Sequence, residues 1–401
     1  MKPRVAIARA ANIADETSVA NAVCRAVQLA CDFESIVRGR EVVLKPNVFC
    51  PLPPPVTTDP RVVSALIALC REAGAARVVV AEGRSISTAK FRKPNASTRK
   101  CFEATGMAAA AKEADEVVYL EEDEFVTVDI PGGQVLKQAS IPKTIAGAEV
   151  LINVPVLKNH SLTLVTLGIK NLHGTISDLD KLFAHDYRRI SSKLVDILRV
   201  NRPALTVIDG IRGLEGDHAD VGRPVDFGAI FAGTDTAACD AVASAAIGLD
   251  PSEVDTTQIA YEQGLGIGDL SQIDIVGVPL ESVRRPFARP DIEIAESRFP
   301  GIRIAAGDYC RGCQYYIRRG IDLLAEKRAL DPSDPLTLIF GKDPQPPENI
   351  EGRIIIVGDC ALASDSIKRL RDRLFLDGRL RIVYTCPPME FRMRALELAD
   401  R

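Results

Sequence analysis

The chain has 401 residues, which is more than one hydrophobic core usually organises, so about two domains are expected. Hydrophobic residues make up 46% and charged residues 26%, as is typical of globular proteins. The 50 basic and 54 acidic residues leave a formal charge of −4, which argues against a general binder of nucleic acid or of membrane surfaces.

Neither a signal peptide nor a membrane span is expected. The opening residues MKPRVAIARAANIADE lead directly into a strand and lack the apolar core of a signal peptide. No apolar run approaches the roughly 18–20 residues that cross a bilayer. We therefore expect a cytoplasmic protein, whose cysteines serve as core residues, metal ligands or catalytic thiols rather than disulfides.

The first part of the chain alternates short apolar strands with helices. Strands of this kind, apolar in runs rather than alternating, are typical of parallel sheets covered on both faces. Strands are expected at 4–8, 41–45, 77–81, 117–120, 149–153, 204–208, 227–232 and 272–277, and helices at 16–32, 60–73, 102–114 and about 177–199. A β-hairpin is expected around 124–142, and the polar, basic stretch 84–100 is expected to be a surface loop.

A second, shorter series follows the Pro- and Arg-rich stretch 278–300, where we place the domain junction. Strands are expected at 302–306, 336–340, 353–357 and 381–384, and helices at 312–327, 364–374 and the C-terminus. The expected fold class is therefore α/β, with a doubly wound, mostly parallel sheet in residues 1–290 and a second, smaller α/β domain in residues 300–401.

Four of the ten cysteines fit the hydrophobic core. Cys24, Cys31, Cys70 and Cys239 fall on apolar faces of predicted helices, where cysteine acts as a small hydrophobic residue. No role is assigned to Cys50 or Cys101. Four cysteines then remain, spaced C-x2-C, 46 residues, C, 25 residues and C-P-P: Cys310, Cys313, Cys360 and Cys386.

These four cysteines are expected to meet. Cys310, Cys360 and Cys386 each follow a predicted strand, and the carboxyl ends of parallel strands share one edge of a sheet. Each is followed by a predicted helix, whose positive end favours the thiolate that binds metal. Pro387 after Cys386 matches the Cys-Pro step of iron–sulfur segments.

The four thiols predict a metal centre, with a [4Fe-4S] cluster as the leading interpretation. A structural zinc site also accepts four cysteines, although such sites usually pair two C-x-x-C knuckles and only one is present here. A dithiol redox pair formed by Cys310 and Cys313, or no site at all, are the other readings.

Polar residues also follow the strands of the first domain. Lys45, Asn47, Glu82, Asn153 and Asp209 all come at or just after predicted strand ends. Individually such residues often cap a neighbouring helix. Together they predict a polar, ligand-binding cleft at the edge of the sheet.

The densest polar segment contains two Lys-Asn pairs, at Lys158 and Lys170, each near a histidine, His160 and His173. We expect a loop and a helix start that grip a small anion, with the lysines neutralising its charge. Either histidine could transfer protons in a catalytic role. The alternative is a solvated helix end with the lysines pointing outward. The dinucleotide, P-loop and GxSxG motifs are missing.

These segments resemble the uncharacterised family catalogued as domain of unknown function 362, over roughly residues 1–280. The matching segments are KPNVF, TTDP, VAEG, NVPVLKNH, LGIKNLHG, VIDG and AGTDTAACDAVAS. The resemblance implies an association with iron–sulfur modules in anaerobic bacteria and archaea. The chain departs from members that append a ferredoxin segment with close CxxCxxCxxxCP runs, because its cysteines are dispersed.

A weaker resemblance, resting on Lys158, His160, Gly168 and Lys170, connects the chain to the nickel-pincer lactate racemase superfamily. The leading expectation is an iron–sulfur protein with a redox role, as an oxidoreductase or an electron carrier. It would bind a small anionic molecule and meet a redox partner protein. The alternatives are a non-redox enzyme, such as an isomerase with a structural zinc, and a non-catalytic binding or assembly protein.

Overall fold

The structure is a computed structural model that describes residues 2–85, 97–216, 222–374 and 376–399. Its contacts divide the chain into two compact units. The first comprises Met1–Ala184 and Arg189–Pro290, and the second His185–Arg188 and Asp291–Arg401. The predicted class is confirmed, since a large, mostly parallel sheet with helices is followed by a smaller C-terminal α/β region. Most of the predicted surface loop 84–100 lies outside the described residues.

The described part of the first unit contains a ten-stranded sheet. Its main path runs through β12 (Asp274–Gly277), β1 (Arg4–Arg9), β11 (Gly222–Gly233), β10 (Leu205–Gly216), β7 (Val150–Asn153), β2 (Glu41–Lys45), β3 (Arg77–Glu82) and β4 (Glu116–Tyr119). β11 is antiparallel to β1 and β10, and the other neighbours on this path are parallel. Beside this path, β8 (Val156–His160) pairs in parallel with β10 and antiparallel with β9 (Leu164–Thr166).

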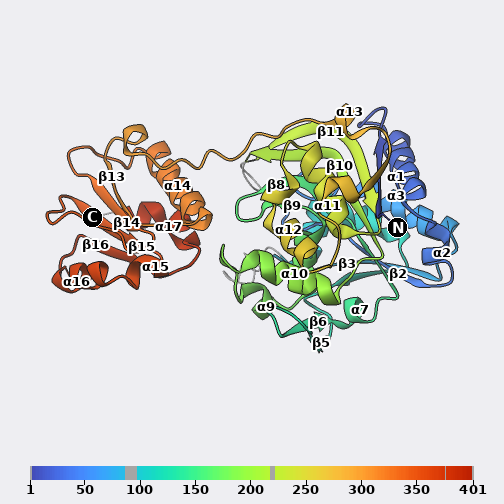
Figure 1. Ribbon diagram of the computed structural model, residues 1–401, viewed down its shortest axis with the longest axis horizontal. Helices are drawn as coiled ribbons and strands as arrows, with labels where there is room; N and C mark the ends of the chain where they lie inside the picture. The colour runs from blue at the N-terminus through green and yellow to red at the C-terminus, as the bar shows by residue number, and fades with distance from the viewer. Residues whose placement is uncertain (1, 86–96, 217–221, 375, 400–401) are drawn as a thin grey trace. The chain divides into compact units, whose positions relative to one another are not determined.

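Helices cover both faces of this sheet (Figure 1). In β1, Ala6 and Ala8 face the core beneath α1 (Glu16–Ala30) and α3 (Pro60–Glu72). Val5 and Ile7, on the opposite face, pack in the core beneath α11 (Thr236–Ala246). This arrangement explains why the strands are apolar in runs, because neither face meets water.

Shorter helical segments complete the first unit. They are α2 (Phe33–Val37), α5 (Thr98–Thr105), α6 (Met107–Ala110), η2 (Ala111–Glu113), α7 (Lys143–Ala146), α8 (Gly168–Asn171), η3 (Leu172–Thr175), α9 (Asp178–Leu182), α10 (Ile190–Val200), η5 (Pro251–Glu253), α12 (Asp255–Glu262), η6 (Leu270–Gln272) and α13 (Leu280–Val283). The predicted hairpin is confirmed as the antiparallel pair β5 (Phe125–Asp129) and β6 (Gln138–Pro142).

The predicted long helix over 177–199 is wrong, because the chain forms the two separate helices α9 and α10. Lys193 of α10 is fully buried, and its Nζ donates to the carbonyl oxygens of Lys181 (2.9 Å) and Phe183 (2.6 Å). This side chain therefore satisfies carbonyls that a continuous helix would have bonded internally. The predicted helix over 102–114 is likewise interrupted, at Gly106, whose φ is 80°.

The described part of the second unit has four parallel strands, in the order β13 (Ile302–Ala306), β14 (Leu336–Phe340), β15 (Arg353–Val357) and β16 (Leu380–Val383). One face packs against α14 (Arg311–Glu326) and α17 (Met389–Ala399), and the other against α15 (Asp359–Leu362) and α16 (Asp365–Arg373). The segment η7 (Glu296–Arg298) precedes β13. A Cβ at Gly320 would lie 2.3 Å from the Phe391 ring, so glycine permits α14 and α17 to cross closely.

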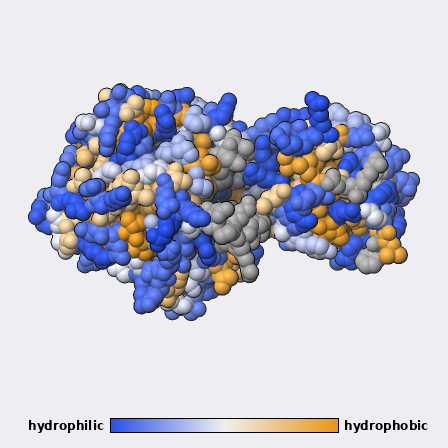
Figure 2. Space-filling model, turned by 180° about the vertical axis from the view of Figure 1, so that it is seen from behind, coloured by the Kyte–Doolittle hydropathy of each residue, from blue (hydrophilic) through white to orange (hydrophobic). Residues whose placement is uncertain are grey.

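None of the helices in the described residues is long and apolar enough to cross a membrane. Figure 2 shows the hydrophobic residues of each unit as separate patches among hydrophilic ones. Scattered patches of this kind are ordinary on protein surfaces and mark no particular partner.

Gly168, at the start of α8, has no room for a side chain. An added Cβ would lie 2.6 Å from Thr236 Cγ2 and 2.8 Å from Asp240 Oδ1. We predict that Gly168→Ala lowers the free energy of unfolding by about 1–3 kcal/mol, because the buried neighbours must shift. Urea unfolding of the first unit measures this change. Gly378→Ala in the second unit, where an added Cβ meets no atom within 4 Å, should leave the first unit's transition unchanged, and an equal shift of that transition by both variants would contradict the prediction.

Candidate functional site

The edge of the first sheet collects the polar residues that the sequence places after its strands. Lys45 and Asn153 are register partners at the ends of β2 and β7, and Glu82 ends the neighbouring β3. Asp209 departs from the prediction, since β10 continues beyond it to Gly216 with an irregularity near Gly210.

Lys45 and Glu82 form a buried ion pair. Lys45 Nζ lies 2.8 Å from Glu82 Oε1, and both side chains are almost completely shielded from solvent. The carboxylate of Glu82 also accepts hydrogen bonds from the backbone N–H groups of Val48 (3.0 Å) and Gly83 (2.8 Å). Burial lowers the pKa of Lys45, and the neighbouring charge of Glu82 opposes that effect. The pair therefore connects the loops that follow β2 and β3.

A chain of amide hydrogen bonds runs from β7 to β8. Asn153 Nδ2 donates to the carbonyl of Gly168 (2.9 Å), and Asn171 Nδ2 donates to Asn153 Oδ1 (2.8 Å). Asn47 Nδ2 donates to Asn171 Oδ1 (2.9 Å), and Lys158 Nζ donates to Asn47 Oδ1 (2.5 Å). The structure thus brings together three asparagines and a lysine from four separate segments.

The first Lys-Asn-His segment was predicted to be a loop, and this is wrong because it forms strand β8. Side chains alternate along a strand, so Lys158 and His160 share one face of β8. Asn159 points to the other face, where its Nδ2 donates to the carbonyl of Ala288 (2.9 Å). The second segment does form a short helix, α8.

Lys158 is only 1% exposed. Its Nζ donates to the carbonyl of Val56 (2.7 Å) in addition to Asn47, and lies 4.6 Å from the centre of the Phe49 ring. Burial lowers the pKa of Lys158 to about 7, while the nearby Cys50 raises it and the charge of Lys170 lowers it further.

Lys170 is half-buried, and burial followed by the charge of Lys45 lowers its pKa to about 8. Within the described residues, neither Lys158 nor Lys170 has a carboxylate partner, and Lys170 has no hydrogen bond. Neither amine therefore forms an ion pair with a described side chain, and a bound anion would favour the protonated form of both.

The two histidines occupy different settings. His160 Nδ1 accepts from the backbone N–H groups of Leu162 (3.1 Å) and Thr163 (3.3 Å), so the proton of a neutral ring is assigned to Nε2. His173 is 7% exposed and lies in η3, directly after α8. Their part in proton transfer stays a prediction.

Two aspartates that the sequence analysis did not single out support the site. Asp240 accepts hydrogen bonds from the backbone N–H groups of Gly168 (2.6 Å) and Ile169 (2.9 Å), and burial raises its pKa to about 7. Asp59 caps α3, and its backbone N–H donates to Asp209 Oδ2 (2.8 Å). Burial, together with the charge of Asp59, raises the pKa of Asp209. The only sequence signal was that each aspartate lies at or near a helix start.

The second unit places Cys310 as the N-cap of α14 and Cys313 in its first turn. The Cys313 thiol donates to Cys310, and the backbone N–H groups of Cys313 and Gly312 add to this, so the pKa of Cys310 is lowered despite its burial. The same bond and burial raise the pKa of Cys313. Cys310 is therefore favoured as a thiolate, as its position at a helix start predicts.

The other two cysteines lie close to this pair. After its bond to Cys310 and its burial, the pKa of Cys313 is raised by the charges of Cys310, Cys386 and Cys360. Burial, then Cys310 and Cys360, raise the pKa of Cys386 to about 12. A Cβ at Gly358, two residues before Cys360, would lie 4.0 Å from Cys313 Sγ.

Cys310, Cys360 and Cys386 follow β13, β15 and β16, whose carboxyl ends lie at one edge of the second sheet. Cys313 is buried, Cys310 and Cys360 are half-buried and Cys386 is exposed. Across the described residues, no three His, Cys, Asp or Glu side chains are grouped as they would be around a metal ion. The metal site therefore stays a prediction, based on the position of these cysteines after strands of one parallel sheet.

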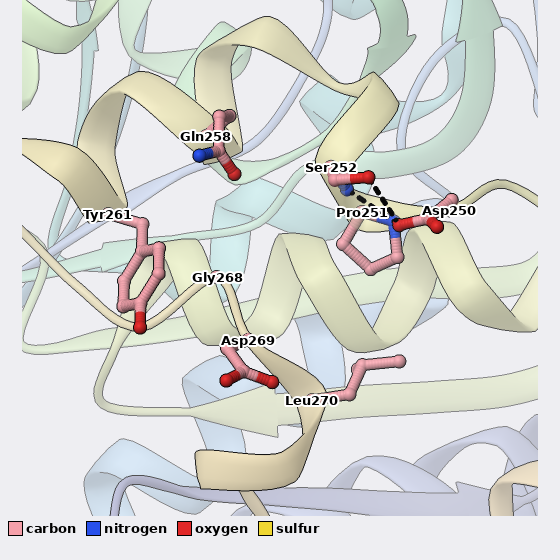
Figure 3. A pocket seen from close by; sticks show the side chains of 8 residues that line it. All are labelled: Asp250, Pro251, Ser252, Gln258, Tyr261, Gly268, Asp269 and Leu270. Carbon is pink, nitrogen blue, oxygen red and sulfur yellow. Dashed lines mark hydrogen bonds between the residues drawn. The ribbon is translucent and has the colours of Figure 1, made fainter.

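A pocket of about 310 Å³ lies elsewhere in the first unit (Figure 3). Its two carboxylates cap short turns. Asp250 accepts from the N–H (2.9 Å) and hydroxyl (2.8 Å) of Ser252, and Asp269 accepts from the N–H of Ser271 (2.9 Å). None of the predicted site residues lines this pocket, so it contributes nothing to the chemistry considered above.

Comparison with known proteins places the polar residues at the edge of the first sheet within a family. Residues 42–245 match the family described as "Domain of unknown function (DUF362)", which is about half of the chain. The chain belongs to this family. The DUF362 segment contains Lys45, Glu82, Lys158, Lys170 and Asp240, whereas the four cysteines of the second unit fall outside it.

A thylakoid-associated protein of Synechocystis (sll1697) is 28% identical to this DUF362 protein over 243 residues, which are 57% of the chain and 69% of the relative. Among solved structures, the lactate racemase apoprotein from Thermoanaerobacterium thermosaccharolyticum is similar to this chain, with a TM-score of 0.41 and 12% identity. The match covers 99% of this chain and 81% of the racemase chain.

The lowered pKa of Lys158 predicts a pH-dependent stability. Between about pH 7 and 10.5, the unfolded chain keeps a proton that the folded chain has released, so stability rises with pH across this window. Below pH 7 the penalty for burying the charge is fully present. We predict that Lys158→Met gains most relative to the natural protein at pH 7 or below, and that the gain shrinks towards pH 10.

Urea unfolding at a series of pH values measures the difference between the two proteins. Lys112→Met replaces an exposed lysine and is the matched control, for which a constant difference is expected. A constant difference for Lys158→Met as well would show that Lys158 keeps an ordinary pKa.

Proposed function

We propose that this protein is an iron–sulfur protein with a redox role, in which Cys310, Cys313, Cys360 and Cys386 hold a [4Fe-4S] cluster. A small anion would bind at Lys158 and Lys170 in the first unit. One observation carries the proposal, namely that Cys310, Cys360 and Cys386 follow three strands of one parallel sheet, whose carboxyl ends share an edge.

The donor set suits such a cluster. Iron–sulfur clusters are held by four thiolates, and the bonds from the start of α14 favour the thiolate of Cys310. The raised pKa values of Cys313 and Cys386 come in part from negative charge on neighbouring thiols, which bound iron ions would compensate. When bound, the cluster would supply one-electron transfer. Because Cys386 is exposed, a redox partner protein could approach this edge.

A second candidate is a non-redox enzyme with a structural zinc at the same cysteines, since four thiolates also suit zinc. The observation that favours it is the burial of Lys158, which lowers its pKa to about 7 and would suit a group that transfers protons at neutral pH. The metal content separates the two candidates.

Substitution of the cysteines tests the proposal. We predict that the protein purified without oxygen contains about four iron and about four sulfide per chain, which is the composition of one [4Fe-4S] cluster. It should show a broad visible absorption that dithionite bleaches. Cys313→Ser and Cys386→Ser should each lose most of the iron, because each removes one of four ligands. Iron and sulfide analysis, with electron paramagnetic resonance of the reduced protein, provides the measurement.

Cys24→Ser is the matched control, because Cys24 is half-buried on α1 and packs against the core of the first unit. It should keep the iron content of the natural protein. A colourless protein with one zinc per chain would reject the cluster and favour the second candidate. Unchanged metal content in both cysteine variants would remove these cysteines from any metal site.

A further inference from the structure

Thr166, at the end of β9, has a buried hydroxyl without a partner. Its side chain is 5% exposed, and its Oγ1 makes no hydrogen bond with any residue that the structure describes. Leaving a hydroxyl buried and unsatisfied destabilises a protein by about 1–3 kcal/mol. Valine would fill nearly the same space without that penalty, so the hydroxyl needs an explanation.

The strand register places this hydroxyl beside the lysine site. Thr166 is the direct register partner of Lys158 in the antiparallel pair of β8 and β9. Side chains of directly opposed residues lie on the same face of a sheet, with Cβ atoms about 4.5–5.5 Å apart. Thr166 Oγ1 therefore faces the same side of the hairpin as Lys158 Nζ.

Three groups with unused hydrogen-bond donors are consequently available in this part of the first unit. A protonated lysine has three N–H donors, and Lys158 directs two of them to Asn47 and Val56. Lys170, whose charge acts on Lys158, directs none of its donors to a described residue. Two ammonium groups and one hydroxyl together suit an oxyanion.

The hydrogen bonds of the backbone at the start of α8 favour a carboxylate ligand over a phosphate. Proteins commonly hold phosphate with backbone N–H groups at a helix start. At the start of α8, beside Lys170, the N–H groups of Gly168 and Ile169 are already bonded to Asp240. Side-chain donors remain, and these match the two oxygens of a carboxylate.

We propose that Thr166 donates a hydrogen bond to the carboxylate of a small organic acid, which Lys158 and Lys170 hold by charge. This inference rests on the anion site proposed above and names its ligand class. The unsatisfied hydroxyl is then a binding group. It destabilises the ligand-free protein and strengthens the binding of the ligand.

Isothermal titration calorimetry of the full chain, prepared without oxygen, tests the proposal at pH 6.5. The probes are acetate, malonate, succinate and inorganic phosphate. A hydrogen bond to a charged group contributes enough that Thr166→Val should weaken carboxylate binding about tenfold. Thr166→Ser keeps the hydroxyl and should keep most of the affinity. Lys170→Met should abolish binding.

Thr257→Val is the matched control. Thr257 is also fully buried with an unsatisfied hydroxyl, and it lies on α12 rather than on the β8–β9 pair. Without ligand, both valine variants should raise the Tm, because each removes an unsatisfied polar group. Only Thr166→Val should also lower affinity. A purely structural threonine would change the Tm without changing binding.

The outcomes separate this inference from the proposed function. If carboxylates bind and require Lys170, but Thr166→Val binds them as well as the natural protein, the role of Thr166 is rejected and the anion site stands. If phosphate binds more tightly than every carboxylate, the ligand class is rejected. If no probe binds to the natural protein, both the anion site and this inference fail, whatever the iron content.

Discussion

The buried ion pair of Lys45 and Glu82 is the contact on which the first unit's site depends. An isolated charge in a protein interior is destabilising by several kcal/mol, so each partner requires the other. Glu82 also accepts the N–H groups of Val48 and Gly83, which ties the loops after β2 and β3 to the pair. Gly174 packs directly against the ion pair, because an added Cβ at this position would lie 2.5 Å from Glu82 Oε1.

Because Glu82 neutralises Lys45, the three lysines at this edge differ in character. Lys45 is a structural cation with an internal counter-ion. Lys158 is held by an amide and a carbonyl oxygen, neither of which cancels its charge. Lys170 has no counter-ion among the described residues. Burial lowers the pKa of both, with a further lowering by the charge of Lys170 at Lys158 and of Lys45 at Lys170, and a bound anion would offset these charges.

The sequence predicted those features that follow from one geometric rule. The rule is that the carboxyl ends of parallel strands lie at the same edge of a sheet. That rule correctly placed Lys45, Glu82 and Asn153 at one edge of the first sheet, and the four-cysteine site that it also predicts stays a prediction. It failed where distant contacts decide the local structure. Lys193 Nζ donates to the carbonyl of Lys181 near the end of α9, where the expected long helix is interrupted. The segment predicted as a loop forms β8 because it pairs with β10 and β9. Thr166 gave no signal, since a threonine near a strand end is ordinary in sequence.

Both candidate sites use the same architecture with different side chains. The DUF362 segment ends its parallel strands in lysine, glutamate and asparagine, whereas the second unit follows its strands with cysteines. Each unit also has its own hydrophobic core, one around Leu44 and Val80 and the other around Leu338 and Ile355. Because a site at a strand edge is supported by the core beneath it, loss of the thiols should affect the second unit's order and leave the lysine site folded. The two sites can therefore be tested one at a time. Coupling between them would be seen as a change in anion affinity when the thiol site is altered, or as a change at the thiol site when the anion binds.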